Sequence, residues 1–169
     1  MYTLGIDATT RKTRLALLKK NEVLFEREWS ANANESETVI KTIKSLTEMT
    51  PLLFEQLEKI ITIHGPGGFN GTRVAVTIAN TLQWLTKGSI IAHDTFTWWR
   101  KRLTGEHKKS KPRLLLKLTE HEIFLDGKPV EFEKFLKEMK KRKSSYHAYG
   151  ELTPSQHHEL KKYEQFQWI

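Results

Sequence analysis

A glycine-rich segment between an expected strand and an expected helix constrains this chain more than any other stretch. Residues 64–73 hold four glycines and a proline within seven positions: Gly65, Pro66, Gly67, Gly68 and Gly71. The apolar run 59–63 before them predicts a buried strand, and residues 72–86 after them predict a helix. Backbone without Cβ atoms can approach an anion or another piece of chain closely. The segment alone leaves both roles open.

Composition narrows the class of protein. The 169 residues carry a net charge of +8, with no cysteine, so disulfides and thiolate chemistry are excluded. Much of the basic excess lies in two runs, 108–113 and 137–143. This charge favours contact with nucleic acid or an acidic protein, or it simply solvates the surface. No signal peptide and no apolar run of roughly 20 residues is visible, so a cytoplasmic location without membrane contact is expected.

Within the first 102 residues, stretches with the strand period of two alternate with stretches with the helical period of about 3.6. Strands are expected at 2–6, 13–19, 23–29, 59–63 and 89–92, and helices at 35–50, 52–57 and 72–86. Asn34 and Glu37 resemble a helix capping box, and Pro51 ends that helix. The main order is β-β-β-α-β-α-β. It predicts an α/β protein with the actin-like ATPase (RNase H-like) fold.

The remaining chain predicts a linker and a reduced second subdomain. The boundaries are 1–102 for the N-terminal subdomain, 103–112 for a polar linker and 113–169 for a smaller α+β part. The latter is expected to contain strands at 114–118, 122–125 and 145–149, a hairpin turn at Asp126-Gly127, a helix marked by Phe132, Phe135 and Met139, a capping box from Thr153 to Gln156, and an apolar tail that docks.

Two segments are candidates for chemistry. Asp7 ends the first strand and precedes Thr9 and Thr10, a pattern that can hold a magnesium-bound water and a phosphate. Gly67 and Gly68 would add free N–H groups. No Lys-Ser or Lys-Thr follows the glycines as in a Walker loop, however, and the spacing is not Gly-x-Gly-x-x-Gly. The alternative is a structural strand-to-helix turn.

The helix after the glycines has two apolar stripes. One contains Val74, Ile78, Leu82 and Leu85, and the other contains Gly71, Ala75 and Ala79. Small residues four apart allow two helix backbones to approach closely. The favoured interpretation is therefore that the glycine segment positions an interaction helix, with anion binding second.

Residues 5–10 (Gly-Ile-Asp-Ala-Thr-Thr) and 65–75 (Gly-Pro-Gly-Gly-Phe-Asn-Gly-Thr-Arg-Val-Ala) together resemble the TsaB (YeaZ) family. The likeness covers about residues 1–100. Ala8, Thr72 and Ala75 depart from the family pattern, and the second half is shortened. The resemblance implies an actin-like fold and a non-catalytic subunit of the complex that forms N6-threonylcarbamoyladenosine in tRNA.

The resemblance also implies partners and a partner surface. The partners would be the catalytic paralogue TsaD and the ATPase TsaE, with tRNA met through the complex and a homodimer expected when the chain is alone. No cofactor would be tightly bound, and ATP or ADP with Mg²⁺ would enter only in the assembled complex. The family's partner surface maps onto eight residues: Ile40, Ile43, Asn70, Gly71, Val74, Ala75, Ile78 and Ala79.

Two other functions stay open. A nucleic-acid-binding module would use the basic runs with Trp98, Trp99, Tyr146 and Tyr149 as stacking platforms, although these aromatics are more simply core residues between the two halves. A stand-alone ATP-dependent phosphotransferase would need a second phosphate loop that the sequence does not show. No metal site is expected, because no two histidines are four residues apart.

Overall fold

A computed structural model describes residues 1–50, 54–103, 107 and 109–169. The chain forms two compact units, Met1–Thr95 and Phe96–Ile169. The division lies seven residues before the expected boundary at 102, because helix α3 (Thr95–Arg102) packs its aromatic side chains into the second unit.

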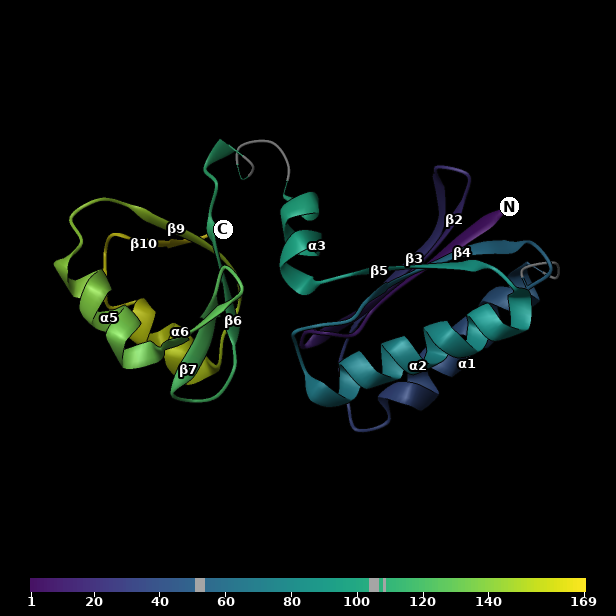
Figure 1. Cartoon of the computed structure of the whole chain (residues 1–169), viewed down its shortest axis with the longest axis horizontal. Coiled ribbons are helices and arrows are strands. Elements are labelled where there is room, and N and C mark those ends of the chain that lie inside the picture. The colour runs from purple at the N-terminus through teal and green to yellow at the C-terminus, as the bar shows by residue number, and fades with distance from the viewer. Residues whose placement is uncertain (51–53, 104–106, 108) are drawn as a thin grey trace. The chain divides into compact units, whose positions relative to one another are not determined.

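The first unit is a five-stranded sheet with two helices (Figure 1). Its elements are β1 (Tyr2–Asp7), β2 (Lys12–Lys19), β3 (Glu22–Ser30), α1 (Glu35–Met49), β4 (Leu57–Ile63), α2 (Phe69–Thr86) and β5 (Ser89–His93). The strand order is β3-β2-β1-β4-β5, with β1, β2 and β3 antiparallel and β1, β4 and β5 parallel. The expected β-β-β-α-β-α-β order is therefore confirmed.

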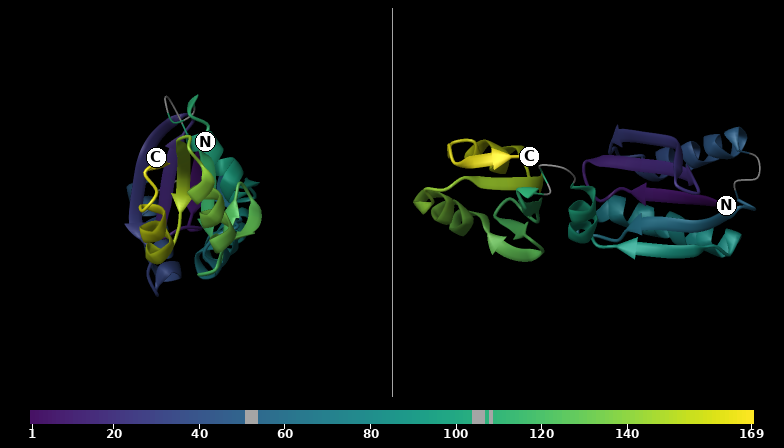
Figure 2. Two further views of the ribbon diagram at one scale, coloured as in Figure 1. Left: turned by 90° about the vertical axis from the view of Figure 1, so that its left-hand side faces the viewer. Right: turned by 90° about the horizontal axis from the view of Figure 1, so that it is seen from above.

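Helices α1 and α2 lie on the same side of this sheet, which Figure 2 shows from above. Buried residues alternate with less buried ones along two strands: Tyr2, Leu4 and Ile6 in β1 are buried, as are Leu15 and Leu17 in β2. A strand with one buried face has this period of two. The helices supply Val39, Ile43, Leu46, Ala75, Ala79 and Leu82 to the same core.

Three local expectations for the first unit are corrected. Asn34 precedes α1 but makes no side-chain cap, so the capping box with Glu37 does not form; instead Glu35 accepts a hydrogen bond from the backbone of Asn32. Strand β4 begins at Leu57, so the expected helix over 52–57 does not reach that residue, and 51–53 lie outside the described residues. Lys59 is exposed, which leaves β4 less buried than its composition indicates.

The second unit is also a five-stranded sheet. After α3 come β6 (Arg113–Lys117), β7 (Glu122–Leu125), β8 (Lys128–Glu131), α5 (Phe132–Lys141), β9 (Tyr146–Glu151), α6 (Pro154–Leu160) and β10 (Phe166–Trp168). The strand order is β10-β9-β6-β7-β8, with β6 parallel to β9 and β9 parallel to β10. Pairing of β10 confirms that the apolar tail docks, and Asp126-Gly127 is the expected hairpin turn.

Alternating residues of β6 serve two small cores. Leu115 joins a cluster with Phe135 and Met139 of α5, whereas Leu114 and Leu116 join one with Trp99 of α3. At α6 the expected capping box is present: the Thr153 hydroxyl accepts from the backbone N–H of Gln156, and the Gln156 side chain accepts from Thr153. Across the ranges that the structure describes, every helix is too short or too polar to span a bilayer.

Candidate functional site

Asp7 at the end of β1 organises a closed turn. Its Oδ1 accepts hydrogen bonds from the backbone N–H of Thr9 at 3.1 Å and from the Thr9 hydroxyl at 2.7 Å. Its Oδ2 is buried and has no partner among the described residues. An aspartate that bonds the backbone two residues on is the usual stabiliser of such a turn. The carboxylate therefore holds the β1–β2 connection in shape.

The glycine segment packs directly on this turn. The backbone N–H of Gly68 donates to the carbonyl oxygen of Thr9 at 2.7 Å. A Cβ at Gly67 would lie 2.3 Å from that same oxygen, and a Cβ at Gly71 would lie 2.0 Å from the carbonyl oxygen of Ala8. Real Cβ atoms do not approach backbone so closely. The absence of a Cβ at Gly67 and Gly71 allows the start of α2 to pack against the turn.

Two donors that a phosphate could use, the Thr9 hydroxyl and the backbone N–H of Gly68, are already bonded. Ala8 and Thr9 are each 1% exposed, and both the hydroxyl and the carbonyl of Thr9 are already bonded. The hydroxyl of Thr10 donates to the carbonyl of Lys12. The structure therefore brings together Asp7, Thr9 and the glycines, as the sequence indicates, but they bind one another. The Thr9 hydroxyl and the Gly68 N–H are therefore not free to bind an anion in this structure.

The small-residue stripe of α2 faces the chain's own core. Ala75 and Ala79 have no exposed surface, and Ile43 of α1 is 5% exposed. Gly71 lies against Ala8. The interpretation that this stripe awaits a partner helix is therefore corrected: close approach is used inside the unit. Ala75, Ala79 and Ile43 cannot contact a partner directly in this structure.

Other members of the expected partner set remain accessible. Ile40 is 56% exposed and Asn70 is also exposed, whereas Val74 and Ile78 are half-buried against the core.

Sequence reasoning missed the most exposed apolar side chains of α2. They are Phe69, Trp84 and Leu85, with exposed fractions of 72%, 68% and 58%. Leu85 belongs by its spacing to the apolar stripe of Val74 and Ile78, but its side chain is exposed. Arg73 lies over the Phe69 ring and Lys87 over the Trp84 ring. The available signal was Trp84, a large apolar residue at a helical position off both stripes.

The aromatic residues of the second half lie within the second unit. Trp99 is 3% exposed and meets Phe96 and Tyr149 edge to face, and Trp98 packs on the same cluster. Tyr146 joins the other cluster, edge to face with Phe135. The expectation that these aromatics are core residues is therefore confirmed, and the clusters that they join lie within the second unit. As stacking platforms for bases, Trp99 and Tyr146 are not accessible.

Comparison with known proteins gives likeness in sequence and in fold. No family model matches the chain. The tRNA threonylcarbamoyladenosine biosynthesis protein TsaB of Bacillus subtilis (strain 168) is 32% identical over 84 residues, which are 50% of this chain and 37% of that protein. The match thus spans well under half the length of TsaB.

Two solved structures from Pseudomonas aeruginosa have a similar fold. One is an uncharacterized protein with similarity to peptidase YEAZ, with a TM-score of 0.67 and 13% identity over 88% of this chain and 75% of that chain. The other is YeaZ, with a TM-score of 0.63 and 14% identity over 88% and 74%. The α/β, actin-like fold class and the resemblance to the TsaB (YeaZ) family are thereby confirmed.

Proposed function

We propose that this chain, similar in sequence to TsaB and in fold to YeaZ, acts in the formation of threonylcarbamoyladenosine in tRNA. Its role is that of a non-catalytic subunit that pairs through α1 and α2 with a TsaD-type catalytic paralogue. A TsaE-type ATPase joins the pair, and tRNA is met in the assembled complex. The proposal follows from the sequence likeness to TsaB, whose name states that pathway.

The observation that carries the pairing is the exposed apolar surface of the two helices. Ile40 of α1 and Phe69, Trp84 and Leu85 of α2 all expose more than half of their side chains. Large aromatic residues with neighbouring cations are typical anchors of protein interfaces. A partner that covers them would remove this apolar surface from water.

The closed Asp7–Thr9 turn supports a non-catalytic role. Catalysis of phosphoryl transfer needs free donors around the phosphate. Here Thr9 is buried and its hydroxyl is bonded to Asp7. ATP or ADP with Mg²⁺ therefore belongs to the complex rather than to this chain alone. The same geometry gives no support to a stand-alone phosphotransferase.

The test is binding of the full chain to a purified TsaD-type protein from the same genome, measured by calorimetry. Trp84→Ala and Phe69→Ala should each weaken binding about 10- to 30-fold, as truncation of an interface anchor does. Val23→Ala is the matched control, because Val23 is 55% exposed on β3, away from both helices. It should bind as the wild type does.

Two results would overturn the proposal. If wild type, Trp84→Ala and Phe69→Ala bound with equal affinity, the α2 surface would be excluded as the partner interface. ATP hydrolysis by the isolated chain that Asp7→Ala abolishes would contradict the non-catalytic role. The active complex should form threonylcarbamoyladenosine in tRNA only when both proteins are present, as mass spectrometry of the nucleosides would show.

A further inference from the structure

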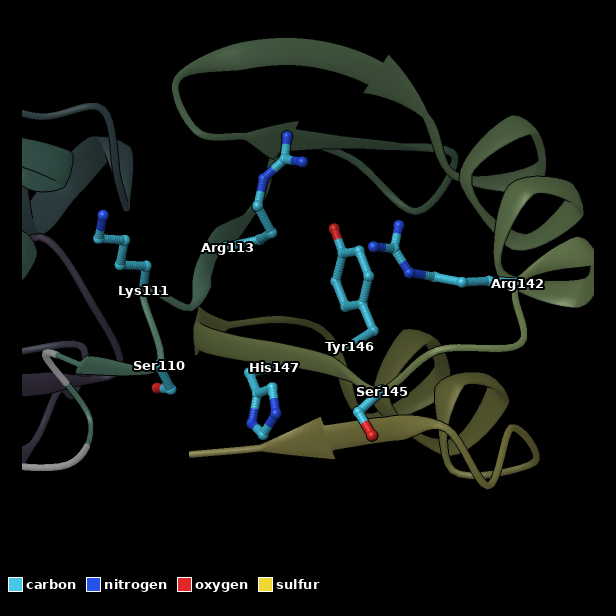
Figure 3. Close-up of a pocket in the computed structure, with 7 residues that line it drawn as sticks. All are labelled: Ser110, Lys111, Arg113, Arg142, Ser145, Tyr146 and His147. Carbon is cyan, nitrogen blue, oxygen red and sulfur yellow. The ribbon is translucent and has the colours of Figure 1, made fainter.

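The second unit contains a basic hollow that none of the roles above uses (Figure 3). Its volume is about 170 Å³, and its lining residues are Ser110, Lys111, Arg113, Arg142, Ser145, Tyr146 and His147. Among the residues that the structure describes, no carboxylate lines it. Sites for drug-sized ligands start at roughly 300 Å³. The hollow therefore fits a small polar group rather than a nucleoside.

The sheet topology explains why these residues meet. Strands β6 and β9 are parallel neighbours, with Arg113 opposite Ala148. The amino-terminal ends of both strands therefore lie at the same end of the sheet, where Arg113 begins β6 and Tyr146 begins β9. Arg142 is the C-cap residue of α5, just before β9. Residues from two separate stretches of the sequence, 110–113 and 142–147, thus line one hollow.

Tyr146 presents an unused donor to this hollow. Its side chain is 5% exposed, and its buried hydroxyl has no partner among the residues that the structure describes. In Figure 3 the phenol oxygen points between the guanidinium groups of Arg113 and Arg142. A buried hydroxyl without a partner is unfavourable, because it has lost its hydrogen bonds to water. An anion in the hollow would satisfy it.

The hydroxyl stays protonated at every physiological pH. Burial raises the pKa of Tyr146 to about 12, with Asp126 and Glu138 acting in the same direction and Arg113 and Arg142 opposing it. A protonated phenol donates a hydrogen bond to an anion.

The cations around the hollow are only partly neutralised. Arg113 pairs with Asp126, which also pairs with Arg100. Arg142 lies over the Tyr146 ring, 5.0 Å from its centroid, and has no ion-pair partner within the described ranges. Lys111 adds a third positive charge. The unit around them has 17 lysines and arginines against 10 acids, a net +7, whereas residues 1–95 carry only +1.

We propose that this hollow binds a phosphate group, with Arg113 and Arg142 facing its charge and the Tyr146 hydroxyl donating a hydrogen bond. The phosphate is either free in solution or part of an RNA backbone; both offer the same oxygens to the same donors. This inference does not depend on the proposed pairing through α1 and α2, because it concerns only the second unit.

The experiment uses the full chain and two probes. Inorganic phosphate is titrated with detection by ³¹P NMR, and a labelled single-stranded oligouridylate is titrated by fluorescence anisotropy at low and moderate salt. Arg142→Gln should weaken binding about tenfold or more, since a charge-assisted bidentate contact is lost. Tyr146→Phe, which keeps the ring, should weaken it about threefold to tenfold. Lys134→Gln on α5, which removes the same charge outside the hollow, should change it less than about twofold.

The titrations distinguish a free phosphate from a phosphate of an RNA backbone. Binding of phosphate without oligouridylate assigns a free phosphate, and oligouridylate binding that phosphate displaces assigns an RNA backbone. For RNA, Arg142→Gln should also reduce the salt slope by about one. Equal losses for Arg142→Gln and Lys134→Gln would mean diffuse attraction and would overturn the site. If neither phosphate nor oligouridylate bound, the site would be overturned as well.

Discussion

A Cβ atom at Gly71 would lie 2.0 Å from the carbonyl oxygen of Ala8. This contact joins the first turn of α2 to the turn after β1. Because the obstacle is backbone on both sides, neither part can yield cheaply. The glycine segment and the Asp7 turn therefore form one structural unit.

Gly71→Ala should lower the free energy of unfolding by at least about 3 kcal/mol, beyond the usual range for overpacking, because a backbone oxygen cannot move aside. Gly68→Ala is the matched control in the same segment, where the nearest atom is 3.7 Å from the added Cβ. It should cost only about 0.5–1 kcal/mol as an N-cap change. Urea unfolding followed by circular dichroism measures both. Similar midpoints would contradict the close packing.

Asp126 is expected to stabilise the second unit through its oxygen atoms more than through its charge. Its Oδ1 accepts from the backbone N–H of Leu114 at 2.8 Å and pairs with Arg100 at 2.9 Å, and its φ is 49°. Asn keeps the acceptor and tolerates this φ. Asp126→Asn should therefore cost less than about 1 kcal/mol and Asp126→Ala about 1–3 kcal/mol. A larger loss for Asn than for Ala in thermal unfolding would refute this order.

Alkaline titration should single out Tyr146. Its pKa is raised from 10.0 to about 12, so the folded state disfavours the tyrosinate. The stabilisation is fully present below about pH 10 and is lost as pH rises toward about 12. Tyr146→Phe should remove this part of the alkaline loss of stability, seen by ultraviolet absorbance and by unfolding at each pH. Tyr163→Phe, which also removes one tyrosine, is the control. An identical alkaline profile for both variants would argue against a raised pKa at Tyr146.

Acid should loosen the contact between α6 and β10. Burial, followed by the charge of Lys161, lowers the pKa of His157 below 6.5, and the ring meets Trp168 edge to face at 5.2 Å. The stabilisation is therefore complete above pH 6.5 and is lost as pH falls through the lowered pKa. Trp168 fluorescence should change over this range in the wild type but not in His157→Phe. His158→Phe, at the exposed neighbouring position, should behave as the wild type does.

The fold of the first unit could be predicted because its signals are local. Tyr2, Leu4 and Ile6 alternate with less buried residues, and the glycines interrupt the pattern where β4 passes into α2. What covers the small face of α2 could not be read from the sequence. A stripe such as Ala75 and Ala79 shows that something approaches closely, but a sheet of the same chain and a partner helix leave the same pattern.

The basic hollow could not be predicted for a different reason. Arg113 and Arg142 are far apart in the sequence, and they meet only because β6 and β9 pair in parallel. Parallel pairing across an intervening helix leaves no local signature in either strand. For Trp84, the sequence shows only an apolar residue that lies off the expected stripes. Its exposure depends on which face of α2 packs on the sheet.

The strand order of the two sheets sets how the chain can fold during synthesis. Every strand of the first sheet lies between Tyr2 and His93, so that sheet can close while later residues are still inside the ribosome. The second sheet has β10 at one edge, paired with β9, and must wait for Phe166 to Trp168 to emerge. Until then the edge of β9 is uncovered. The interval before β10 emerges is thus the period in which the second sheet is most exposed to mispairing with other nascent chains.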